Sequence, residues 1–101
     1  MDKLRNKNME LLLKAIRTLK SADECYAFFR DVCTYKELED ISQRIVVAEM
    51  LLKDRVYNDI TEKTGASTAT ISRVKRTLVD GNDGYALVFE RLRLIDSEKL
   101  K

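Results

Sequence analysis

The sequence contains no proline and no histidine, and its 101 residues include only three glycines and two cysteines. Proline and glycine interrupt helices, so their scarcity favours an all-α fold. Without histidine, the chain lacks the commonest general base at neutral pH and the commonest metal ligand. We also find no glycine-rich phosphate loop and no carboxylate pair in an evident cleft. The sequence therefore does not indicate an enzyme.

The two cysteines, Cys25 and Cys33, are eight positions apart and form no Cys-x-x-Cys pair. They do not indicate a zinc or redox site, and their apolar neighbours favour small buried side chains. No apolar run is long enough to cross a bilayer, and the amino terminus is too polar for a signal peptide. These features predict a cytoplasmic protein with no metal and no membrane partner.

Length and charge narrow the choices further. A chain of 101 residues matches the commonest size of one domain, which can bury a modest core. We therefore expect residues 1–101 to form a single domain. The formal net charge is only +2, so overall charge does not indicate a nucleic-acid partner. Evidence for a nucleic-acid partner must therefore come from the charge pattern of one segment.

Apolar residues recur at helical spacing along the chain. The pattern predicts six helices, at residues 4–19, 22–32, 35–53, 57–64, 68–79 and 84–95. Capping boxes should start the second and third helices, because Ser21 and Glu24, and likewise Thr34 and Glu37, can satisfy each other's backbone N–H groups. Val56 offers no such cap, so the start of the fourth helix is weakly encoded.

The stretch 60–78 carries the most specific pattern. Gly65 can take the positive φ that a tight turn requires, and Ser67 is a good N-cap for the helix that follows. Ile71 and Val74 then begin an apolar stripe along that helix. Two short helices joined by such a turn are typical of a helix-turn-helix, whose second helix enters the major groove of DNA.

The polar side of that second helix supports the same interpretation. Between residues 65 and 79 there are three basic residues and no acidic one. Small side chains near the helix start would let the backbone approach the bases, and cations further along could contact phosphates or guanine edges. The predicted base-proximal residues are Thr68, Ala69 and Ser72, and the predicted cationic contacts are Arg73, Lys75 and Arg76. Ser67 and Thr70 complete the predicted DNA-binding set. The alternative is an ordinary αα-hairpin with a solvated face.

The helix at 35–53 is apolar over much of its circumference, so it needs cover on several sides. We expect a second copy of the chain to supply part of that cover, within a homodimer. The alternative is that the other helices of the same chain suffice. After the helix-turn-helix, Gly81 should end the helix in a left-handed conformation, and Asn82 or Asp83 should cap the last one. The apolar face of that last helix, which includes Ile95, would pack on the first and third helices of the same chain or of a partner. A charged tail at 96–101 should be frayed.

The segment from Thr64 to Arg73 closely resembles the turn and recognition helix of the Trp repressor, and the match extends upstream through 42–52. The segments 4–7, 24–29, 65–76 and 81–85 make the whole chain most similar to the YerC/YecD-like branch of the Trp repressor superfamily. This resemblance implies a bacterial, six-helix, intertwined homodimer. Residues 1–53 would form the dimerisation helices, 57–79 the helix-turn-helix and 84–95 a C-terminal packing helix.

The resemblance also implies which residues meet DNA. Two helix-turn-helix units on one face would read half-sites about 34 Å apart. By position, Thr68, Ala69 and Ser72 match residues that face the bases or bridging waters; the Trp repressor itself is a known case of water-mediated readout. Thr61 falls where the repressor has a phosphate-binding lysine, so that contact is not carried over. Whether Lys63 replaces it is open.

The corepressor site departs from the family pattern. Arg44 and Arg73 are the counterparts of the two arginines that hold tryptophan, and Thr34 and Thr77 match hydroxyl residues that line the pocket. However, Val74 stands where the repressor has a glycine, and it should fill the space that an indole ring needs. We therefore expect no tryptophan corepressor, and the effector is unknown. Arg73 is then expected to contact phosphate, and Arg44 to form an ion pair with Glu37 or Glu49.

These observations predict a homodimeric, sequence-specific transcriptional regulator that binds double-stranded DNA, most simply as a repressor. Two other functions remain open. The chain could be a DNA-binding accessory factor without a regulatory role. It could also be a dimeric protein-interaction module, in which the helix-turn-helix docks on protein.

Overall fold

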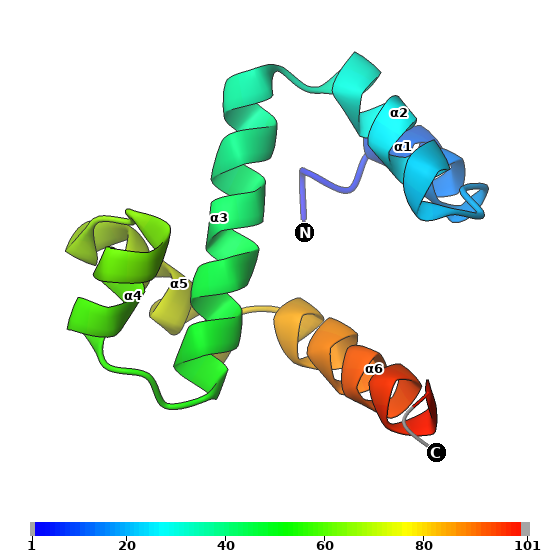
Figure 1. Ribbon diagram of the computed structural model, residues 1–101. Coiled ribbons are helices and arrows are strands. Elements are labelled where there is room, and N and C mark those ends of the chain that lie inside the picture. Colours follow the sequence, from blue (N-terminus) through cyan, green and yellow to red (C-terminus); the bar gives the residue numbers. More distant parts are fainter. Residues whose placement is uncertain (1, 100–101) are drawn as a thin grey trace. The chain divides into compact units, whose positions relative to one another are not determined.

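The computed structural model describes the backbone of residues 2–99 and the side chains of residues 2–93. Over this range the chain forms six helices and no strand, which confirms the all-α prediction (Figure 1). The helices are α1 (Lys7–Arg17), α2 (Ala22–Val32), α3 (Tyr35–Leu52), α4 (Tyr57–Thr64), α5 (Thr68–Asp80) and α6 (Gly84–Lys99). No helix within the described residues is long and apolar enough to span a membrane.

The helix ends depart from the prediction in two places. α1 begins at Lys7 rather than at residue 4, because the Asn6 side chain accepts the Met9 N–H at 3.0 Å and caps the helix there. α6 continues to Lys99, four residues beyond its predicted end, so the backbone of 96–99 is helical rather than frayed. The predicted apolar position Ile95 lies outside the described side chains.

One of the two capping boxes forms as predicted. The Glu37 N–H donates to Thr34 Oγ1 at 3.1 Å, and the Thr34 N–H donates to Glu37 Oε1 at 2.8 Å. This second bond favours the ionised carboxylate, so it lowers the pKa of Glu37. At the other box, Ser21 Oγ accepts the Glu24 N–H as predicted. However, Glu24 Oε1 accepts the backbone N–H of Lys20 rather than that of Ser21. Ser21 is extended, and the amide in reach of the carboxylate is the preceding one.

Contacts along the chain divide it into two units, Met1–Leu38 and Glu39–Lys101. In the first unit, neither α1 nor α2 has a fully buried residue. Some of their apolar side chains are half-buried, whereas Leu11, Tyr26 and Val32 are exposed. The rings of Phe28 and Phe29 pack edge to face with centroids 5.4 Å apart. The first unit therefore has apolar faces without a closed core of its own.

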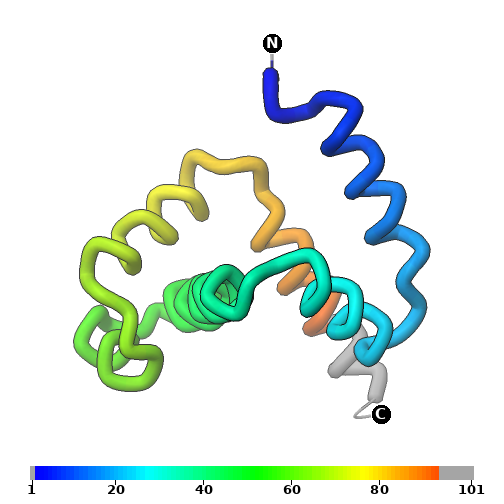
Figure 2. Tube along the Cα trace, turned by 90° about the horizontal axis from the view of Figure 1, so that it is seen from above, coloured from blue at the N-terminus to red at the C-terminus, as the bar shows by residue number. Residues whose placement is uncertain are grey.

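The second unit contains the buried core. α4 and α5 lie on one side of α3 and α6 lies on the other, as the two views in Figures 1 and 2 show. The core draws on all four helices and on the turn between α4 and α5, with Val47, Ala48, Met50, Ile60, Ala66, Ile71, Val74 and Phe89 buried. The apolar stripe predicted to begin at Ile71 and Val74 does face the core.

Two glycines of this unit are required for different reasons. Gly65 ends α4 with φ +73°, the left-handed conformation predicted for the turn. Gly81 ends α5 with φ −86°, so the left-handed conformation predicted for it is wrong. A glycine is instead required at position 81 for steric reasons, because a Cβ there would lie 2.3 Å from the Thr77 carbonyl oxygen. The left-handed residue of this loop is Asp83, with φ +62°.

The three glycines make a matched series. Gly65→Ala should lower the free energy of unfolding by about 1–2 kcal/mol because of its positive φ. Gly81→Ala should cost about 1–3 kcal/mol because its Cβ would collide with Thr77. Gly84→Ala meets nothing within 4 Å and has no positive φ, so we expect no loss of stability. Urea denaturation followed by circular dichroism measures all three; equal stabilities for Gly81→Ala and Gly84→Ala would contradict the steric account.

Candidate nucleic-acid interface

The turn between α4 and α5 is closed by a short network of hydrogen bonds. The Gly65 N–H donates to the Thr61 carbonyl at 2.9 Å. Thr64 Oγ1 donates to the Ile60 carbonyl at 2.7 Å and accepts the Ala66 N–H at 3.1 Å. The backbone groups left over at the end of α4 thus find partners within the turn, which fixes the direction in which α5 leaves it.

A side chain of α3 also anchors this turn. Gln43 Nε2 donates to the Thr64 carbonyl at 3.1 Å, and the bond is partly buried. Sequence reasoning did not single out Gln43 for this role. The two partners are 21 residues apart, so no local spacing rule could have paired them. The bond ties the helix-turn-helix to the helix on which it packs.

The start of α5 is capped as predicted. Ser67 Oγ accepts the Thr70 N–H at 3.1 Å, and the two hydroxyls of these residues also lie 3.1 Å apart as a hydrogen-bonded pair. Ser67 is exposed and Thr70 is half-buried. Both hydroxyls are therefore engaged in the cap. By contrast, the start of α4 at Val56 has no side-chain cap, in agreement with the prediction.

α5 has one buried side and one exposed side. Ile71 and Val74 are 0% and 2% exposed, and they pack in the core of the second unit. The opposite side, which we call the exposed face of α5, consists of Thr68, Ala69, Ser72, Arg73 and Arg76. The structure thus brings together every predicted base-proximal residue and two of the three predicted cations. Within residues 2–93, neither arginine side chain is held in an ion pair.

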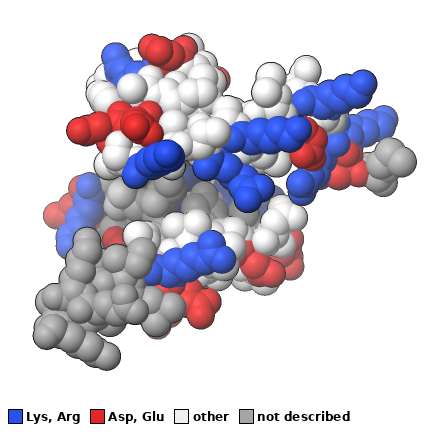
Figure 3. All heavy atoms as spheres, turned by 90° about the vertical axis from the view of Figure 1, so that its right-hand side faces the viewer, with Lys and Arg blue, Asp and Glu red and all other residues white. Residues whose placement is uncertain are grey.

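The third predicted cation, Lys75, lies at the edge of this face. Its Nζ is 5.8 Å from the centroid of the Tyr57 ring, at the start of α4. Positive charge is thus gathered in the middle of α5, whose one acidic residue, Asp80, stands at the C-terminal end. In Figure 3, basic and acidic side chains are both spread over the face shown, so the charge on that face is mixed. Local charge on α5, not the net charge of +2, distinguishes this surface.

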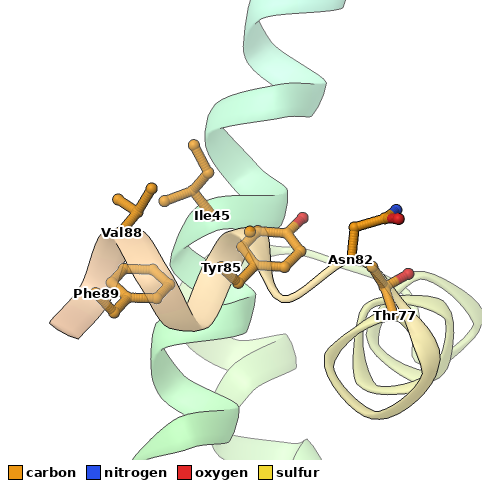
Figure 4. A pocket seen from close by; sticks show the side chains of 7 residues that line it. Ile45, Thr77, Asn82, Tyr85, Val88 and Phe89 are labelled. Carbon is orange, nitrogen blue, oxygen red and sulfur yellow. The ribbon is translucent and has the colours of Figure 1, made fainter. Parts of the chain in front are cut away.

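Of the four residues predicted for a ligand pocket, Thr77 lines a cavity within the second unit. A cavity of about 450 Å³ opens between α3, α5 and α6, and it is lined by Ile45, Thr77, Asn82, Gly84, Tyr85, Val88 and Phe89 (Figure 4). It includes Thr77 but neither Arg44 nor Arg73. Thr77 Oγ1 is moreover bonded to the Arg73 carbonyl at 3.1 Å. Thr34 belongs to the first unit, where its hydroxyl accepts in the cap of α3.

The predicted ion pair of Arg44 with Glu37 or Glu49 is not found among the described side chains. Glu37 Oε1 accepts the Thr34 N–H, and Glu49 Oε2 lies 3.9 Å from the Nζ of Lys53, one turn further along the chain. Over the same residues, no group of three or more histidine, cysteine or acidic side chains is placed to hold a metal ion.

Comparisons with known proteins agree with this architecture. The Trp repressor protein family matches residues 7–93. The uncharacterised protein YerC of Bacillus subtilis (strain 168) is 47% identical over 97 residues, which cover 96% of this chain and 93% of that protein.

Two solved structures are also similar. A TrpR-like protein from Eubacterium eligens ATCC 27750 is 60% identical, with a TM-score of 0.87 over 89% of this chain and 93% of the other. A protein from Staphylococcus aureus, described as a candidate Trp repressor, is 47% identical, with a TM-score of 0.87 over 90% of this chain and 91% of the other. By sequence and by fold, the chain belongs to the Trp repressor family, in its YerC-like branch, a family of DNA-binding regulatory proteins rather than of enzymes.

Proposed function

We propose that the chain is a sequence-specific transcriptional regulator that represses as a homodimer and inserts α5 into the DNA major groove. One observation carries the proposal: a glycine turn and a buried apolar side hold α5 so that small and cationic side chains share its exposed face. Phosphate contacts position such a helix, and contacts to base edges give it specificity.

The order of side chains along α5 suits this task. Thr68, Ala69 and Ser72 occupy the N-terminal half of the exposed face, and Arg76 follows one turn later. Short side chains let the helix lie deep in a groove, where hydroxyls can reach base edges directly or through water. Arginine extends further and can bind a phosphate or a guanine edge in two-pronged fashion. Sequence reading and backbone anchoring would thus come from different parts of one helix.

Unpartnered apolar surface supports the homodimer. On α3 the side chains of Ile41, Ile45, Val46 and Leu52, and on α6 those of Leu87, Val88 and Leu92, are each at least 38% exposed. Apolar surface on this scale marks an interaction site in a small protein. Two copies would cover each other's faces and present two copies of α5, which suits an operator with two half-sites.

The side chain at Val74 argues against tryptophan as corepressor. Val74 is 2% exposed and packs in the core, so the volume at this position is already filled. We infer that tryptophan does not bind and that any effector of the regulator is a different molecule.

Selection from random DNA should yield a site with two-fold symmetry and half-sites about one helical turn apart. Against the selected site, Arg76→Ala should weaken binding and reduce the slope of log affinity against log salt by about 0.9, the value for one lost phosphate contact. Lys14→Ala on α1 is the control that keeps the slope. A selection that enriches no sequence would favour a protein-interaction module, and an unchanged slope would remove Arg76 from the phosphate contacts.

Sedimentation equilibrium tests the homodimer. The unmodified chain should sediment as a dimer, and Val88→Glu should yield monomers because it places a charge on the apolar face of α6. Val56→Glu is the matched control, since Val56 is just as exposed but precedes α4 in a loop; it should remain dimeric. A monomeric unmodified chain would contradict the proposal.

Calorimetric titration with tryptophan should give no saturable heat, because Val74 occupies the space for a ring. The same titration in the presence of operator DNA covers the case in which binding needs the complex. Saturable binding of tryptophan with an effect on DNA affinity would show that Val74 leaves room for the ring.

A further inference from the structure

Lys75 and Tyr57 form a contact that connects the two helices of the helix-turn-helix. The Lys75 Nζ lies 5.8 Å from the centroid of the Tyr57 ring, within the distance at which a ring face attracts a cation. Tyr57 is half-buried and packs against the core of the second unit, so its ring is held in place. Lys75 is exposed, and the described residues offer it no ion pair.

Lys75 lies at one edge of the exposed face of α5. At about 100° per residue, Arg73 and Lys75 are separated by roughly 160° around the helix axis, with Ser72 and Arg76 between them. The two cations therefore stand on opposite edges of the exposed face. Lys75 is on the edge nearest α4, where the Tyr57 ring lies.

A flexible lysine loses rotamer freedom when it binds a phosphate, whereas a lysine already restricted by a ring loses less. An ammonium acts as a point charge, suited to a phosphate rather than to a specific base edge. We propose that Tyr57 is a positioning residue, which holds the Lys75 ammonium for a DNA phosphate contact on the α4 side of the exposed face. This inference rests on the DNA-binding function proposed above.

A double-mutant cycle on the selected DNA site tests the proposal. Tyr57→Leu removes the ring face and should weaken binding by about two- to fivefold, the factor that matches an exposed cation–π contact. Tyr57→Phe keeps the ring and should bind like the unmodified chain. Lys75→Gln should reduce the salt slope by about 0.9. In the Lys75→Gln background, Tyr57→Leu should have no further effect.

The chain supplies a matched control for the loss of a ring contact. On α2, the Arg30 guanidinium carbon lies 5.9 Å from the centroid of the Tyr26 ring, nearly the same separation, but outside the helix-turn-helix. Tyr26→Leu should leave DNA affinity and salt slope unchanged. Thermal melts of every variant show whether a substitution lowers the stability of the fold. A loss of affinity caused by lower stability would be the same with Lys or Gln at position 75, whereas a loss caused by the ring contact would need Lys75.

A measurement without DNA separates this inference from the proposed function. The ring should shift the Lys75 side-chain methylene protons upfield in NMR spectra, in the unmodified chain and in Tyr57→Phe but not in Tyr57→Leu. If the chain binds a DNA site but the two substitutions act independently, the role of Tyr57 is overturned and the DNA-binding function stands. Tighter binding by Tyr57→Leu would also overturn it, since the ring would then hold Lys75 away from DNA. A chain that selects no DNA overturns both.

Discussion

The burial of Ile60, Ile71 and Val74 against Val47 is the constraint on which the rest of the structure depends. These four side chains are 0–2% exposed, and each contributes about 1.5–3 kcal/mol by leaving water. Their packing holds α4 and α5 on α3, and it decides which side of α5 remains exposed. The arrangement of small and basic residues on that side is therefore a consequence of core packing on the other.

The second unit completes its core with few residues, and much apolar surface stays uncovered. Val46 lies next to fully buried Val47 on α3, yet it is 46% exposed. The first unit contributes helices with no fully buried residue at all. The proposed function therefore joins DNA recognition to self-association, because a second copy of the chain would cover apolar surface of this kind.

Features encoded by neighbouring residues were predictable from the sequence, and features made by distant residues were not. The turn at Gly65 and the cap at Ser67 follow from local chemistry, and the Ile71/Val74 stripe follows from helical spacing. Gln43 was missed because its partner is 21 residues away, and the role of Gly81 was misjudged because it depends on a close approach to a carbonyl oxygen rather than on φ. Five of the eight predicted DNA contacts lie on the exposed face of α5, and the roles of all eight stay predictions.

The hydrogen bond from Gln43 to the Thr64 carbonyl has a mechanical consequence. The turn cannot open while α3 stays in place unless this partly buried bond and the adjoining Thr64 bonds break together. This bond and the shared core thus connect α4 and α5 to the part of α3 that lies in the second unit, and a movement of α5 alone would disturb both. In the proposed homodimer, a shift of this part of α3 would carry α5 with it, so the long helix rather than the turn would set the spacing of the two recognition helices.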